Sequence, residues 1–174
     1  MLAASPIAED TSFSRTVILL CRHGPIGVFG LLLNRPLGAE VERCLPDFAA
    51  PMVTLGVMFN CGLVNVSSAF AVCFERRVPD ESWSRRVVDG VGLIALEDVV
   101  EVVADDVEVK RVLSRYVVWS AGQLAMQIAA QGLLVVGARG EGVSTSMPET
   151  LWLDVLRRQL GRLVMAATIR MTHR

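Results

Sequence analysis

The junction at residues 117–124 constrains the fold of this chain most strongly. A run rich in β-branched residues ends at Trp119, three small residues follow, and an amphipathic segment opens at Gln123. β-Branched and aromatic residues favour strands, whereas apolar residues spaced three and four apart favour a helix. The sequence therefore predicts a strand over 112–119 that leads almost directly into a helix over 123–131. Leu124, Ile128 and either Ala125 or Ala129 form its expected inner face, and Gly132 is expected to end it.

The rest of the chain alternates short apolar runs with turn signals. Strands are expected at 16–21, 28–34, 53–59, 69–74, 87–96 and 133–136, and further helices at 39–48, 96–104 and 149–160. Loops are expected at 60–65 and 139–146, and an exposed connection with an edge strand at 75–86. Because the early strands form a hairpin and the helices do not alternate regularly with strands, we predict an α+β fold. Its sheet is mainly antiparallel, it carries several helices, and it forms a single compact domain over 1–174.

The apolar content is high but distributed. Hydrophobic residues make up 52% of the chain and the mean hydropathy is +0.47. A membrane-spanning helix needs about 20 consecutive apolar residues, and the turn at 22–25 interrupts the longest apolar stretch. With neither a span nor a secretory signal in the sequence, we expect a cytoplasmic protein. The four cysteines are expected to be reduced, buried thiols, because none forms a Cys-x-x-Cys pair: Cys21, Cys44, Cys61 and Cys73. No metal or cofactor is expected.

The charge balance does not favour nucleic-acid binding. The formal net charge is −1 at pH 7, whereas nucleic-acid-binding domains usually present a basic face. A local bias near the C-terminus is best read as solvated helix and tail surface: Arg157, Arg158, Arg162, Arg170 and Arg174. Direct contact with nucleic acid is therefore not expected.

Several segments, in order, resemble the YqgE/AlgH family of bacterial proteins. The opening segment 4–23, the run Gly-Leu-Leu-Leu-Asn-Arg-Pro at 30–36, the Trp-Ser-Ala-Gly-Gln-Leu run at 119–124 and the segment 151–161 carry the resemblance. It implies a compact α+β domain from a bacterial cytosol. The family's names suggest transcriptional regulation without supplying a biochemical activity. The chain departs from the family pattern at 61–64, at Cys73, and at Ala125 and Gln127, where acidic residues are usual.

Four residues are candidate ligand contacts. Asn34 and Arg35 precede Pro36 at an expected strand end, where an arginine can grip a carboxylate or phosphate. Trp119 and Gln123 flank the turn into a helix, whose first N–H groups can hold an anion. The alternative for each is architectural: Asn34 closes a turn, Arg35 pairs with an acid, Trp119 fills the core and Gln123 caps the helix.

No catalytic set is predicted. Strand alternation would place Cys21 and His23 on one face, but a nucleophilic pair needs a third, orienting group. The glycine-rich run at 139–142 lacks the Lys-Ser/Thr of a phosphate loop. We therefore expect a non-enzymatic domain that acts through a protein partner or a small ligand, with homo-oligomerisation left open. The alternatives are a direct DNA-binding regulator and a cryptic nucleotide-binding or small-molecule-binding enzyme using Asn34, Arg35 and Gln123.

Overall fold

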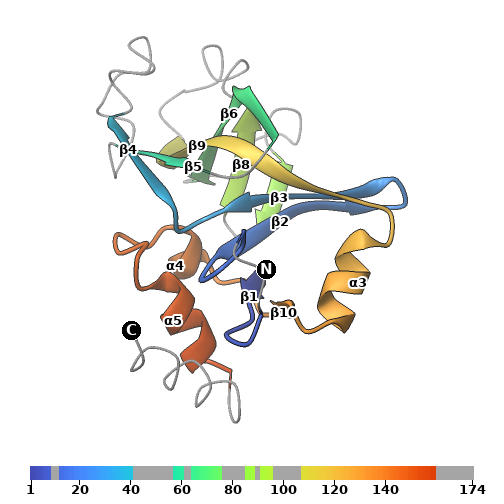
Figure 1. Ribbon diagram of the computed structural model, residues 1–174. Helices are drawn as coiled ribbons and strands as arrows, with labels where there is room; N and C mark the ends of the chain where they lie inside the picture. The colour runs from blue at the N-terminus through green and yellow to red at the C-terminus, as the bar shows by residue number, and fades with distance from the viewer. Residues whose placement is uncertain are drawn as a thin grey trace.

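The computed structural model describes residues 1–8, 12–40, 57–60, 64–75, 85–88, 91–95 and 107–159. They form one ten-stranded sheet and three helices (Figure 1). The strands are β1 (Leu2–Ala4), β2 (Val17–Gly24), β3 (Gly27–Leu32), β4 (Pro36–Glu40), β5 (Val57–Asn60), β6 (Val64–Glu75), β7 (Arg85–Val88), β8 (Val91–Ala95), β9 (Val107–Ser120) and β10 (Leu133–Val135). The helices are α3 (Gln123–Ala129), α4 (Gly140–Val143) and α5 (Leu151–Arg157).

The sheet is antiparallel with one exception. Its main path runs β10-β1-β2-β3-β9-β6-β8-β7, and every neighbouring pair on that path is antiparallel. β4 pairs with β5, which runs parallel to β9. The predicted α+β class with a mainly antiparallel sheet is confirmed. No helix among the residues described here has the length and apolar character needed to cross a membrane.

The long strand β9 joins the two halves of the sheet. Its last four residues, 117–120, pair with the start of β3, and residues 112–114 pair on the same edge with β5. β6 runs along the opposite edge. The predicted strand over 112–119 is therefore confirmed, and it extends further towards the N-terminus. In Figure 1 it runs across the upper half of the molecule, above β2 and β3, and ends close to the start of α3.

Both faces of the sheet around β2 are buried. Val17 and Leu19 belong to the core cluster that contains α5, whereas Ile18 belongs to the cluster of Trp119 and Leu124 on the other face. α5 and α3 thus cover opposite faces of the same strands. Two buried faces require apolar residues at every position, which explains why β2 opens with the continuous apolar run Val-Ile-Leu-Leu-Cys.

The predicted helix over 39–48 is wrong at its start. Residues 39 and 40 lie in β4, where Pro36 pairs with Phe59 and Glu40 with Val57. Proline is tolerated as the first residue of a strand, so Pro36 opens this strand. The helical spacing of apolar residues in this short segment is outweighed because β5, which is distant in sequence, supplies hydrogen-bond partners for a strand. The remainder of this helix lies outside the described residues, as do the expected helix over 96–104 and the strand residues 53–56.

The single strand expected over 87–96 is also wrong. β7 and β8 are two strands that pair with each other, with Val88 opposite Val91. The sequence between them is Asp-Gly, which is the dipeptide that two-residue hairpin loops favour. β7 is the last strand of the main path, in agreement with an edge strand near 75–86. Val64 and Asn65, expected in a loop, belong to β6.

The helices of the last third differ from the prediction at their ends. α3 confirms the helix over 123–131, but Gln131, with a φ of 58°, adopts the left-handed conformation expected of Gly132. Leu124 is buried, whereas Ala125 and Ala129 are exposed and do not form an inner face. The expected loop over 139–146 contains the short helix α4, and α5 begins at Leu151, two residues later than predicted.

Candidate functional site

Asn34 and Arg35 hold the chain that precedes β2. The Asn34 side chain accepts a hydrogen bond from the Val17 N–H and donates one to the Arg15 carbonyl, each at 2.8 Å. Arg35 donates through Nη2 to the Ser14 carbonyl at 3.3 Å. Both side chains therefore make architectural contacts, and within the described residues the partner of Arg35 is a backbone carbonyl and not an acid.

The segment that they hold is strained and firmly anchored. Arg15 has a φ of 55°, a left-handed conformation that costs a non-glycine residue about 1–2 kcal/mol. The N–H and the hydroxyl of buried Thr16 both donate to the Phe13 carbonyl. The Arg15 guanidinium lies 6.0 Å from the centre of the Trp152 ring, and the indole N–H of Trp152 donates to the Ala4 carbonyl. These contacts join β1, β2, β3 and α5.

Trp119 and Gln123 organise the other end of β3. Trp119 is 1% exposed, stacks on Phe13 at 6.1 Å between ring centres, and donates to Gln127 Oε1 at 2.8 Å. Gln123 Oε1 accepts hydrogen bonds from the N–H and hydroxyl of Ser120. Gly122 between them has a φ of 80°, and a Cβ there would meet no atom within 4 Å. Glycine is therefore required at this position for its left-handed backbone conformation, and not because a neighbouring segment leaves no room for a side chain.

The four predicted contacts do not converge. Trp119 pairs with Val28 near the start of β3, whereas Asn34 comes two residues after its last residue. The chain from Val28 to Asn34 spans at most about 20 Å, because it bends after β3 at residues 33 and 34. None of the four residues lines either of the hollows described below. Their role as ligand contacts stays a prediction.

Cys21 and His23 do not share an environment. Cys21 is a buried thiol whose Sγ donates to the Leu19 carbonyl at 3.5 Å, whereas His23 is exposed. The pairing of β2 with β3 shifts register between Leu20 and Arg22. Such a bulge interrupts strict alternation, and the expectation of a common face is therefore wrong. Within the described parts of the chain, no three His, Cys, Asp or Glu side chains gather as metal ligands.

A hollow of about 440 Å³ lies between the N-terminal segment and the end of α3. We call it the α3 hollow. Its lining comes from two parts of the chain that β1 and β10 bring together: Ala4, Ile7, Ala8 and Phe13, then Gln127, Ala130, Gln131, Gly132 and Leu133.

The α3 hollow is apolar with two carboxamides. Gln127 is oriented, because the indole N–H of Trp119 can only donate and therefore takes the carbonyl oxygen of the amide. The NH₂ group of Gln127 is then the end that can donate to a bound molecule. Phe13 forms part of the wall and stacks on Trp119. Among the residues that the structure describes, the lining includes no charged side chain.

Sequence reasoning missed Phe13, Gln127 and Gln131 as lining residues. Gln127 lies one helical turn after Gln123, and it was visible only as a departure from the acidic residues of the family pattern. Phe13 and Gln131 carried no signal, because their proximity depends on the pairing of β1 with β10.

The comparisons with known proteins agree with this fold. A family model described as AlgH-like matches residues 1–164. The chain belongs to this AlgH-like family. The UPF0301 protein SCO2948 of Streptomyces coelicolor is 37% identical over 174 residues, covering 97% of this chain and 89% of the relative. A UPF0301 protein of Streptomyces avermitilis is 35% identical over 176 residues, with the same coverage of 97% and 89%.

Two solved structures have a similar fold. The crystal structure of protein DIP2367 from Corynebacterium diphtheriae has a TM-score of 0.81 at 24% identity, covering 95% of this chain and 88% of that one. The solution structure of the AlgH protein from Pseudomonas aeruginosa has a TM-score of 0.68 at 21% identity, covering 99% and 91%. At these identities the likeness concerns the fold.

Proposed function

We propose that this AlgH-like protein binds a small, uncharged and mostly apolar molecule in the α3 hollow. The observation that carries the proposal is the lining: apolar side chains on most sides, with two carboxamides that can fix a ligand's orientation. The volume of about 440 Å³ lies in the range of small-molecule sites. An ionised ligand would lose hydration there without gaining a charged partner among the described lining residues, which favours a neutral one.

Binding suits this lining better than catalysis. Acid–base and nucleophilic catalysis need His, Asp, Glu, Lys, Cys, Ser or a comparable group within reach of the substrate. None of the described residues that line the α3 hollow supplies such a side chain. The proposal is therefore a non-enzymatic role in which the liganded protein passes a signal to a protein partner.

The proposal also covers the cellular location of the protein and its relation to DNA. We place the protein in a bacterial cytosol and assign any effect on transcription to its ligand or protein partner, not to contact with DNA. The net charge of −1 supports this choice, because DNA binding draws most of its affinity from phosphate neutralisation. A gel shift with a pool of bacterial promoter fragments tests it, and a retarded, salt-sensitive band would favour the DNA-binding alternative.

A thermal-shift screen with a library of neutral metabolites tests the binding role, since a ligand that binds only the folded state raises the melting midpoint. Ala130→Trp fills the α3 hollow from an exposed position, and we expect it to abolish the shift. Ala125→Trp is the matched control, because Ala125 is exposed on the same helix but does not line the hollow. No stabilising neutral compound, or equal binding to the Ala130→Trp variant, would overturn the proposal.

A further inference from the structure

A second hollow, of about 360 Å³, lies between α4 and α5. We call it the arginine groove. Its lining shares no residue with the α3 hollow and includes three arginines: Arg139, Glu141, Gly142, Thr145, Leu151, Asp154, Arg157 and Arg158. α5 covers the opposite face of the sheet from α3, so the two hollows are separate sites.

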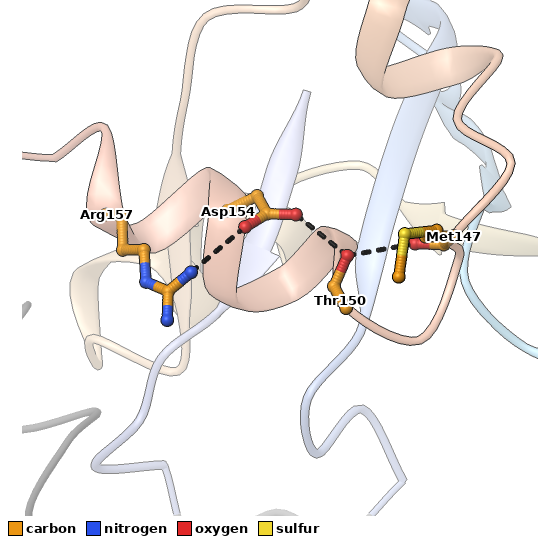
Figure 2. A network of polar contacts seen from close by, with 4 residues as sticks. All are labelled: Met147, Thr150, Asp154 and Arg157. Carbon is orange, nitrogen blue, oxygen red and sulfur yellow. Dashed lines mark hydrogen bonds and ion pairs between the residues drawn. The ribbon is translucent and has the colours of Figure 1, made fainter.

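One acid of the groove is already engaged. Figure 2 shows Asp154 between two partners, with Oδ1 3.4 Å from Arg157 Nη1 and Oδ2 2.8 Å from the Thr150 hydroxyl. The Thr150 hydroxyl also lies 3.2 Å from the Met147 carbonyl, which holds it in place. The Asp154–Arg157 pair is exposed, with 51% and 69% of the side chains accessible, so it contributes little to stability.

The other two arginines line the groove together with a second acid, Glu141. In the part of the chain that the structure describes, Arg139 and Arg158 have no acidic partner within ion-pair distance. Arg139 immediately precedes α4, and Arg158 immediately follows α5. Arg158 reaches across to α4, because its Nη2 would lie 3.9 Å from a Cβ at Gly142. Two guanidinium groups from two helices therefore border one hollow.

A buried arginine lies behind the wall of the groove and holds part of that wall in place. Arg111 on β9 is fully buried, and its guanidinium donates to the carbonyls of Thr145 and Leu33. Thr145 is itself a lining residue.

We propose that the arginine groove binds a small molecule through an oxyanion, a phosphate or carboxylate group. A guanidinium offers a planar pair of N–H donors that matches two oxygens of either group. Arg139 and Arg158 would hold the oxyanion from opposite sides, and the remaining volume admits a small organic substituent. Binding at this groove does not depend on the α3 hollow.

The test follows arginine Nε–Hε resonances by NMR while inorganic phosphate, pyrophosphate or citrate is added. We expect saturable shifts with at least one of these probes. Arg139→Gln and Arg158→Gln should each raise the Kd of that probe by roughly tenfold or more, because each removes a hydrogen bond to a charged group. Asp154→Asn should strengthen it several-fold, because a competing carboxylate is removed. Arg22→Gln is the matched control, since Arg22 is exposed on β2 and should leave the affinity unchanged.

The outcomes divide cleanly. Binding of the phosphates alone, or of citrate alone, supports the proposal and decides between the two oxyanions. An absence of saturable shifts at millimolar probe, or unaltered affinity in both Arg139→Gln and Arg158→Gln variants that melt like the parent, overturns it. The Ala130→Trp variant keeps this result apart from that of the α3 hollow, because it should bind the oxyanion normally.

Discussion

At the scale of single residues, polar side chains bond to backbone N–H and carbonyl groups that have no strand partner where the chain leaves the sheet. Asn34 does so most clearly, because its amide serves the Val17 N–H and the Arg15 carbonyl together. Val17 is fully buried, so its N–H would otherwise have no access to water. The same amide also helps to hold Arg15 in its left-handed conformation.

Asn34→Ala should lower the free energy of unfolding by about 1–3 kcal/mol, because it leaves a buried N–H without its acceptor. Asn34→Asp keeps an acceptor for the Val17 N–H but sets an oxygen against the Arg15 carbonyl where the amide donated, so it should also destabilise the protein. Urea denaturation measures both. If Asn34→Ala unfolds at the parent's midpoint, the amide does not support the fold.

At the scale of elements, the turn between β9 and α3 depends on one glycine. Trp119, just before the turn, stacks on Phe13, and α3, just after it, packs against β9 and β10. Gln123 reinforces it by accepting from both the N–H and hydroxyl of Ser120. The left-handed backbone at Gly122 makes this short connection possible.

Gly122→Ala should destabilise the protein by about 1–2 kcal/mol, because an alanine there pays for the left-handed backbone conformation. Gly137→Ala is the matched control. A Cβ at either position meets no atom within 4 Å, but only Gly122 has a positive φ. Thermal denaturation compares the two variants, and equal melting midpoints would contradict the backbone argument.

At the scale of the whole molecule, Arg111 connects the centre of the sheet to its helical cover. It projects from β9, the strand shared by both halves of the sheet, and holds the chain at Leu33 and at Thr145 before α5. Thr145 in turn accepts the Met147 N–H through its hydroxyl at 3.2 Å. One side chain thus anchors two connections that are distant in sequence.

Arg111→Lys should cost about 2–4 kcal/mol, since one ammonium cannot reproduce the two-armed donation and leaves buried polar groups without partners. The loop before α5 should loosen, so the Met147 N–H should exchange with deuterium faster than in the parent. Hydrogen exchange followed by NMR measures this effect. A parent-like exchange rate at Met147 would show that the loop holds its place without Arg111.

Segments whose structure depends on neighbouring residues could be predicted from the sequence, whereas segments that depend on distant partners could not. The strand over 112–119, the helix after it and the antiparallel α+β class were predictable, because each depends on local apolar runs and a short turn. The predictions of a helix from residue 39 and of a single strand over 87–96 were wrong. Residues 39 and 40 pair with a strand distant in sequence, and β7 and β8 pair with each other. The separation of Asn34 from Trp119 along β3, and the contribution of Phe13 and Gln127 to one hollow, could not be read from spacing.

The sequence by itself determined that the segment at 16–21 forms a strand, and the continuous apolar run Val-Ile-Leu-Leu in β2 suits a strand that is covered on both faces. The tertiary structure alone decided which polar residues meet. Trp119 reaches Gln127, and Arg158 approaches Gly142, through positions that strand pairing and helix packing fix. The hydrophobic pattern is local and can be read along the chain, whereas hydrogen bonds and charge clusters form between residues that only the folded chain brings together.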